Sequence, residues 1–312
     1  MENQRKETAS AEADIKKAIE VAPASPAGDV AFAKLRISQN KPEDAEKYFQ
    51  QALTKDPNQL DSIRGLVEIF MKKKQPEKAT ALVSAHLQQS PNNDALYTLQ
   101  GVLQANLKKF PDAEASLQKA TQLNPSNTSA FLMLAQVQAS QGATDRAVTT
   151  AYNLIQQNPQ NVQGYVLAGD LENSRNNFQK AQDLYQKALQ IQPDYAPAAN
   201  DLAYLMLERG GNTDVALSLA QTARRAMPDS PMTADTLAWA YYYKGTYEFA
   251  RDLLEDAAKA DPGNATIQYH LGMVYRKLSD KTSAVAHLKK AVSLARDPAV
   301  AKDAKAALQG LG

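Results

Sequence analysis

Apolar side chains recur every three to four residues along most of the chain, and short polar stretches containing Pro, Gly, Asn or Asp interrupt them. A spacing of three to four residues places apolar side chains on one face of an α-helix, whereas a strand would alternate them. The polar stretches hold residues that end helices and form turns. The pattern therefore predicts an all-α protein made of many short amphipathic helices.

A proline follows these segments at a fixed interval of 34 residues, with one interval of 35. The prolines are Pro23, Pro57, Pro91, Pro125, Pro159, Pro193, Pro228 and Pro262. An alanine lies twelve residues before each proline, at Ala11, Ala45, Ala79, Ala113, Ala147, Ala181, Ala216 and Ala250. Chance does not produce such a series, and a period of 34 predicts a helix-turn-helix unit repeated in tandem.

Small residues also recur where the two helices of a unit must cross, because helices approach closely only where side chains are small. A second alanine lies five residues before the proline in six units, at Ala18, Ala52, Ala120, Ala188, Ala223 and Ala257. The first helices carry Gly101, Gly169, Gly272, Ala33, Ala135, Ala203, Ala238 or, in one unit, Val67 at the contact position. We expect Phe49, Tyr185 and Leu288 to fill the space between the alanines.

The period divides the chain into three parts. Residues 26–297 hold eight full units, which begin near Pro26, Leu60, Asp94, Thr128, Val162, Ala196, Pro231 and Ala265. We place the extra residue of the sixth unit in its inter-helix turn, at Gly210-Gly211, because glycines absorb an insertion without bending a helix. Residues 298–312 are expected to form a capping helix from about Pro298 to Gln309.

Residues 1–25 match only the second helix of a unit, through Ala11, Ala18 and Pro23. One interpretation is that the chain was cut from a longer protein and that Met1 is an artificial start. The other is that an unpaired helix serves as an N-terminal cap.

A unit of this length and pattern, with an aromatic residue at Tyr97, Phe131 and Tyr165, resembles the tetratricopeptide repeat (TPR). The resemblance covers nearly the whole chain. It implies a right-handed superhelical α-solenoid whose first helices line a concave groove and whose second helices form the convex face. It also implies a protein that binds other proteins or peptides and has no enzymatic activity.

In such an array, positions 2, 5, 9, 12 and 13 of each first helix point into the groove. In the last three units these positions concentrate aromatic, methionine and hydrogen-bonding residues, the types that dominate binding surfaces. The predicted groove residues are Asn200, Tyr204, Leu207, Asp235, Trp239, Tyr242, Tyr243, Tyr269, Met273 and Arg276. We expect Trp239, the only tryptophan, to be partly exposed, with Tyr204 and Tyr269 at its sides. The alternative is that Trp239 and Tyr242 belong to the core.

Two functions remain open at this stage. One is a scaffold that binds a protein or peptide segment in the C-terminal groove. The other is a structural spacer inside a larger bacterial export or assembly protein, without a ligand groove. If Trp239 is buried in the core, the groove interpretation fails and the spacer takes the lead.

Residues 200–204, 235–239 and 269–273 resemble the C-terminal repeats of bacterial exported repeat proteins of polysaccharide-export and PEP-CTERM-type systems. This resemblance implies a periplasmic or envelope-associated protein rather than a cytoplasmic one, although the chain lacks the lipid-attachment cysteine and the signal that such proteins carry.

Composition and charge narrow the possible partners. The 312 residues are 44% hydrophobic and 22% charged, as in ordered proteins. Lys and Arg number 35 and Asp and Glu 34, so the basic excess of a nucleic-acid binder is missing and we expect no nucleic-acid partner. No apolar run approaches the roughly 18 residues of a membrane span, so we expect no direct membrane insertion by this segment.

Candidate chemistry is sparse. The chain has no cysteine, which excludes disulfides and thiolate metal sites. His86, His270 and His287 are not spaced as metal ligands, and Gly210-Gly211 lacks the lysine that follows in a phosphate loop. We expect solvated positions for His86 and His287 and a partly buried His270. The sequence predicts no catalytic residue, no metal and no cofactor.

Overall fold

The computed structural model describes the backbone of residues 2–311 and the side chains of residues 10–311. Within these residues the regular elements are eighteen α-helices, with no strand, so the all-α fold class is confirmed. The first helices of the pairs are α2 (Ala27–Ser38), α4 (Leu60–Lys72), α6 (Asp94–Asn106), α8 (Thr128–Ser140), α10 (Val162–Ser174), α12 (Ala196–Glu208), α14 (Pro231–Lys244) and α16 (Ala265–Lys277). The second helices are α3 (Pro42–Lys55), α5 (Pro76–Gln89), α7 (Phe110–Leu123), α9 (Thr144–Gln157), α11 (Phe178–Ile191), α13 (Thr213–Ala226), α15 (Tyr247–Ala260) and α17 (Lys281–Leu294). The helix α1 (Glu2–Val21) precedes these pairs and α18 (Pro298–Gln309) follows them.

Side-chain caps recur at the start of the first helices. Asn93, Asn127, Asn161 and Asn264 occupy equivalent places, and each accepts a hydrogen bond from a backbone N–H in the first turn of α6, α8, α10 or α16. Such a cap satisfies an amide that has no partner inside the helix. An asparagine cap that recurs with the repeat therefore fixes where these helices begin.

Each inter-helix turn contains one residue in the left-handed region, with a positive φ. These residues are Asn40, Lys74, Lys108, Gly142, Asn176, Gly210, Gly245 and Ser279. They are one period apart, and only three are glycine, although glycine adopts this conformation most easily. The sixth turn spans residues 209–212, one residue longer than the fifth turn at 175–177, as expected for the insertion beside Gly210.

The sizes of the residues that face each other explain how the first and second helices of a repeat cross. A Cβ added to Gly169 would lie 2.4 Å from the Tyr185 ring, and one added to Gly101 would lie 2.5 Å from Leu117. A glycine on the first helix therefore makes room for a large side chain on the second.

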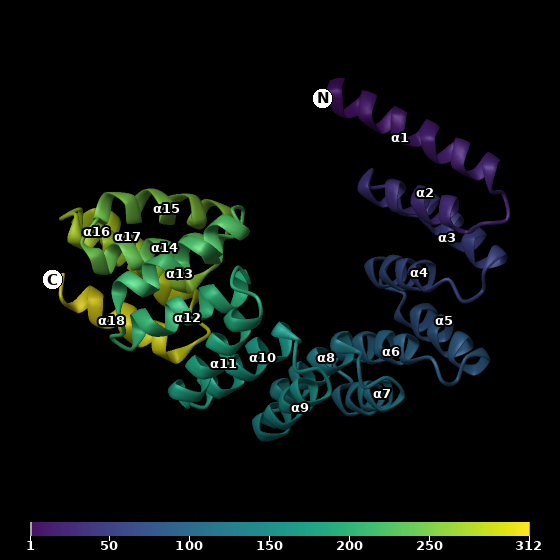
Figure 1. Ribbon diagram of the computed structural model, residues 1–312. Coiled ribbons are helices and arrows are strands. Elements are labelled where there is room, and N and C mark those ends of the chain that lie inside the picture. The colour runs from purple at the N-terminus through teal and green to yellow at the C-terminus, as the bar shows by residue number, and fades with distance from the viewer. Residues whose placement is uncertain (1, 312) are drawn as a thin grey trace. The chain divides into compact units, whose positions relative to one another are not determined.

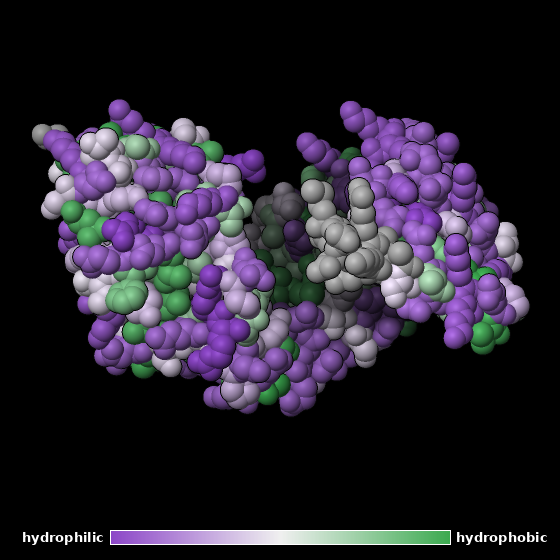
Figure 2. All heavy atoms as spheres, turned by 90° about the horizontal axis from the view of Figure 1, so that it is seen from above, coloured by the Kyte–Doolittle hydropathy of each residue, from purple (hydrophilic) through white to green (hydrophobic). Residues whose placement is uncertain are grey.

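The chain divides into two compact units, Met1–Gln157 and Asn158–Gly312, between the fourth and fifth repeats. Within each unit, successive helices pack side by side in chain order (Figure 1). The apolar residues of each unit face these helix contacts, whereas the surface in view in Figure 2 is mostly hydrophilic with small apolar patches. None of the described helices is long and apolar enough to span a membrane.

In the first unit, α1 packs on α2. The Ile19 side chain lies against Gly28, and Arg36 forms an ion pair with Glu12 across the same contact. The residues of α1 that face away from α2 are exposed to solvent, and Val21 at its end is 79% exposed. Ala18 is exposed as well, whereas the equivalent Ala52 of the next repeat is buried.

Candidate functional site

A pocket of about 260 Å³ lies on the side of the second unit formed by its first helices. Four first helices, α10, α12, α14 and α16, contribute to it, and the capping helix α18 with its N-cap residue completes the wall. The lining residues are Asn173, Tyr204, Leu205, Glu208, Arg209, Trp239, Tyr243, Thr266, Tyr269, His270, Asp297, Ala299, Val300 and Asp303. We call this cavity the α12–α18 pocket.

The helical period explains why residues distant in sequence meet here. Tyr204 and Trp239 occupy the ninth place of successive first helices, and Glu208 and Tyr243 the thirteenth. Equivalent places in stacked repeats lie side by side, so the same face of each helix contributes to one wall. Four of the ten predicted groove residues line the pocket: Tyr204, Trp239, Tyr243 and Tyr269.

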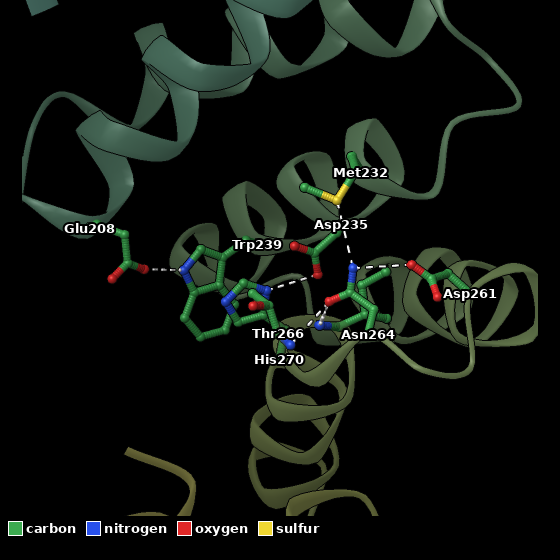
Figure 3. Close-up of polar contacts among 9 residues, drawn as sticks. Glu208, Met232, Asp235, Trp239, Asp261, Asn264, Thr266 and His270 are labelled. Carbon is green, nitrogen blue, oxygen red and sulfur yellow. Dashed lines mark hydrogen bonds and ion pairs between the residues drawn. The ribbon is translucent and has the colours of Figure 1, made fainter. Parts of the chain in front are cut away.

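Trp239 is buried, with only 3% of its surface exposed, and the expected partial exposure is wrong. Its ring lies between two parallel rings, with centroids 3.9 Å away for His270 and 4.4 Å for Tyr242. Its Nε1–H donates a hydrogen bond of 2.8 Å to Oε1 of Glu208 (Figure 3). Rings from its own and the next repeat cover the indole, so Trp239 forms the floor of the pocket and is not an open anchor.

Behind the indole, His270 and Asp235 form a buried pair. The Nδ1 atom of His270 lies 2.8 Å from Oδ1 of Asp235, and Figure 3 shows the two side chains pointing toward each other. The exposed fraction is 1% for the His270 side chain and 5% for that of Asp235. The periodicity did not predict this pair, because it assigns residues to a helix face but does not give the direction of each side chain. The signal for it was that both occupy neighbouring places on successive first helices.

The other predicted residues lie around the pocket. Leu207 packs in the core beside Trp239, and Met273 lies half-buried between that core and the α18 contact. Asn200 is buried, and its Nδ2 donates to Asp201, while its Oδ1 has no hydrogen bond within the described residues. Arg276 is exposed, with its guanidinium beside Gly310.

Carboxylates missing from the predicted set line the α12–α18 pocket: Glu208, Asp297 and Asp303. Burial and the charge of Glu208 raise the pKa of Tyr204 and of Tyr243. Burial, and then the charges of Asp303 and Glu208, raise the pKa of Tyr269 to about 12. These tyrosines therefore keep neutral hydroxyl groups near neutral pH, in a region of negative potential.

Further along the same face, Asp170 on α10 lies near Asp201 on α12. Its carboxylate keeps access to solvent, but surrounding protein displaces much of its water, and this burial together with the Asp201 charge raises the pKa of Asp170 to about 7. The Tyr185 hydroxyl donates to Asp170 over 2.8 Å and opposes part of this shift.

The two remaining histidines are less solvated than expected. His86 is partly buried, and this burial lowers its pKa. The His287 ring stacks on Tyr275, and its Nδ1 lies 2.7 Å from Oε1 of Gln268. His287 therefore packs on α16, the first helix of its own repeat, and both histidines are only partly exposed. No group of three or more possible metal ligands occurs among the described residues.

Comparison with known families identifies the repeat. One family model with the description "Tetratricopeptide repeat" matches residues 36–103 and 174–240, and a second with the same description matches residues 98–162 and 236–301. The two models together cover most of the chain. A search of curated proteins finds no match.

Solved structures share the fold. The APC/C hetero-tetramer Cut9–Hcn1 matches with a TM-score of 0.64 and 17% identity over 94% of this chain, which spans 57% of that chain. A tetratricopeptide repeat protein from Parabacteroides merdae has a TM-score of 0.58 and 21% identity, over 80% of this chain and 98% of its own. PilF of Pseudomonas aeruginosa has a TM-score of 0.55 and 17% identity, over 68% of this chain and 96% of its own. At these identities the likeness is one of fold.

Proposed function

Because the chain belongs to the tetratricopeptide repeat family, we propose that it is a scaffold that binds a protein or peptide segment on the first-helix face of its second unit. TPR proteins generally mediate protein–protein interactions and are generally non-catalytic. The α12–α18 pocket is the place where a side chain of the bound segment anchors.

The observation that carries this proposal is the presence of partly exposed aromatic residues around a pocket built by successive repeats. Tyr243 is 48% exposed, and Tyr204 and Tyr269 are half-buried beside it. Tyrosines held rigidly at a concave site supply contact area at little cost in conformational entropy. The volume of about 260 Å³ is below that of ordinary small-molecule sites and suits one side chain of a longer ligand.

The alternative is a spacer segment of a larger bacterial export or assembly protein. The burial of Trp239 favours it, because this residue is then explained by packing alone. Packing does not explain Tyr243, which keeps about half of its surface open. For that reason we place the scaffold first.

A site-specific crosslinking experiment separates the two functions. A photoreactive phenylalanine analogue replaces Tyr243 in cells that make the protein, and a matched variant carries it at Phe249, which is 65% exposed on the second helix α15. A scaffold gives a discrete crosslinked partner at position 243 and not at position 249. If both variants are folded and neither position crosslinks to a partner, the result favours the spacer.

We further propose that the protein is exported in bacteria and is periplasmic or associated with the envelope. The basis is that residues 200–204, 235–239 and 269–273 resemble repeats of exported scaffolds. Fractionation of cells that express the natural gene with a small C-terminal tag tests this location. Recovery of the tagged protein in the cytoplasmic fraction alone contradicts it.

A further inference from the structure

The charges of the α12–α18 pocket are unbalanced. Three carboxylates line it, those of Glu208, Asp297 and Asp303, and none of them forms an ion pair within the described residues. The one basic side chain among the lining residues is Arg209, whose guanidinium carbon lies 3.5 Å from the centroid of the Phe178 ring. Arg209 is therefore held against α11, and the pocket retains an excess of negative charge.

These carboxylates also retain free acceptor capacity. Glu208 accepts one hydrogen bond, from the Trp239 indole, and Asp297 accepts one from the backbone of Ala299 as the N-cap of α18. Asp303 accepts none from the described residues. An ionised carboxylate has about four acceptor sites, so all three can bind further donors.

The neutral groups of the pocket suit the same kind of ligand. Tyr204, Tyr243 and Tyr269 present electron-rich rings and hydroxyl oxygens, which attract cations. In the neutral tautomer whose Nδ1–H donates to Asp235, the second ring nitrogen of His270 is an acceptor, and it has no hydrogen bond within the described residues. Acceptors thus surround the cavity on several sides.

We propose, as an extension of the scaffold function above, that the α12–α18 pocket takes the side chain of a lysine or an arginine of the bound segment. The long apolar stem of such a side chain packs on the tyrosine rings and on Val300, and its charged head reaches the carboxylates. The partner is therefore a basic segment, and the pocket selects it by charge and shape together.

Electrostatics beyond the pocket support this assignment. Burial raises the pKa of Asp170 to about 7, and repulsion from the Asp201 carboxylate on the same face contributes to the rise. A bound cation relieves that repulsion, whereas an acidic segment increases it.

A peptide-display selection tests the inference on the full chain. Random twelve-residue peptides are selected against the wild type and against the double variant Glu208→Gln/Asp303→Asn. The glutamine keeps an oxygen for the Trp239 hydrogen bond, so the pocket floor stays intact. The control, Glu248→Gln/Asp256→Asn, removes the same charge from exposed positions on α15. Circular dichroism establishes that all three proteins are folded.

The expected result is enrichment of lysine or arginine at one fixed position in peptides selected by the wild type and by the control. A synthetic peptide from this set should bind the pocket variant about tenfold or more weakly, and its affinity for the wild type should fall with added salt. Replacing its basic residue by norleucine should have the same effect as the pocket substitutions.

The failures are distinguishable. If peptides bind, and Tyr243→Ala weakens them while no basic residue is enriched, the scaffold function stands and the cation pocket is wrong. If acidic peptides are enriched instead, the pocket prefers the opposite charge, and the proposed preference for a lysine or an arginine is wrong. If no peptide binds the folded wild type, this inference falls together with the scaffold function on which it rests.

Discussion

The imidazole of His270 and the carboxylate of Asp235 form a hydrogen bond of 2.8 Å between α14 and α16, with both side chains almost fully buried. Asp235→Ala leaves the imidazole nitrogen without a partner in the core and should lower the free energy of unfolding by about 1–3 kcal/mol. Asp235→Asn keeps an acceptor oxygen and should cost less. Urea unfolding of the three proteins measures the difference. Asparagine has nearly the volume of aspartate, so equal losses in both variants would mean that the charge of the Asp235 carboxylate stabilises the pair and that an acceptor oxygen alone does not.

Trp239 makes intrinsic fluorescence a report on the pocket floor, because the chain has no other tryptophan. With 3% of its surface exposed, its emission should be blue-shifted and resistant to quenching by acrylamide in the free protein. Emission typical of a solvated indole would show that the stack with His270 and Tyr242 opens in solution. Tyr243→Ala, which uncovers the indole edge, should raise the quenching constant measurably.

The titration of Asp170 predicts a pH dependence of stability. Its carboxyl ionises near 3.8 in the unfolded chain and near 7 in the folded protein, so folding binds a proton between these values. The free energy of unfolding should therefore fall as the pH rises from about 4 to about 7.

Asp170→Asn should flatten this dependence and stabilise the protein at pH 8 by on the order of 1 kcal/mol, since solvent near Asp170 screens the repulsion. The amide oxygen can still accept from Tyr185. Asp194→Asn removes a charge from an exposed loop and serves as the control. An unchanged pH profile in Asp170→Asn would contradict the raised pKa.

Lys108 in the third inter-helix turn has a φ of 59°, in the region that glycine tolerates best. Lys108→Gly should raise the free energy of unfolding by roughly 0.5–1 kcal/mol, because relief of backbone strain outweighs the added flexibility of the unfolded chain. Gly142→Ala at the equivalent turn should cost about 1 kcal/mol, since its added Cβ meets no atom within 4 Å and only the backbone is strained. Thermal unfolding measures both, and changes of the same sign would contradict the assignment.

The pairing of Gly169 with Tyr185 predicts a strong energetic coupling. Gly169→Ala places a methyl group 2.4 Å from a ring that is 1% exposed, and should cost about 1–3 kcal/mol. In a Tyr185→Ala background the same substitution should cost little, as in repeats that pair two alanines, such as Ala135 with Ala151. Gly263→Ala, at an open loop position, is the control and should be nearly neutral. Additive losses in the double variant would mean that the two residues do not touch.

Much of the fold could be predicted from the sequence because its causes are local and recur with the period. Small residues at Ala181 and Gly169 mark helix crossings, and the turn insertion at Gly210 lies where two glycines stand together. These features depend on contacts within one repeat or between neighbours, so a 34-residue period displays them directly. The groove positions 2, 5, 9, 12 and 13 of the first helices likewise include half of the residues that line the pocket.

Only the tertiary structure decided which side chains on that face are open. The covering of Trp239 depends on the rings of Tyr242 and His270, and the pairing of His270 with Asp235 crosses two repeats. Periodicity assigns a residue to a face of its helix, but rotamers and the neighbouring helix determine whether water reaches it. The same reason explains why the carboxylates of the α18 region were missed: Asp303 belongs to the pocket only because α18 packs against α16 as a further first helix would.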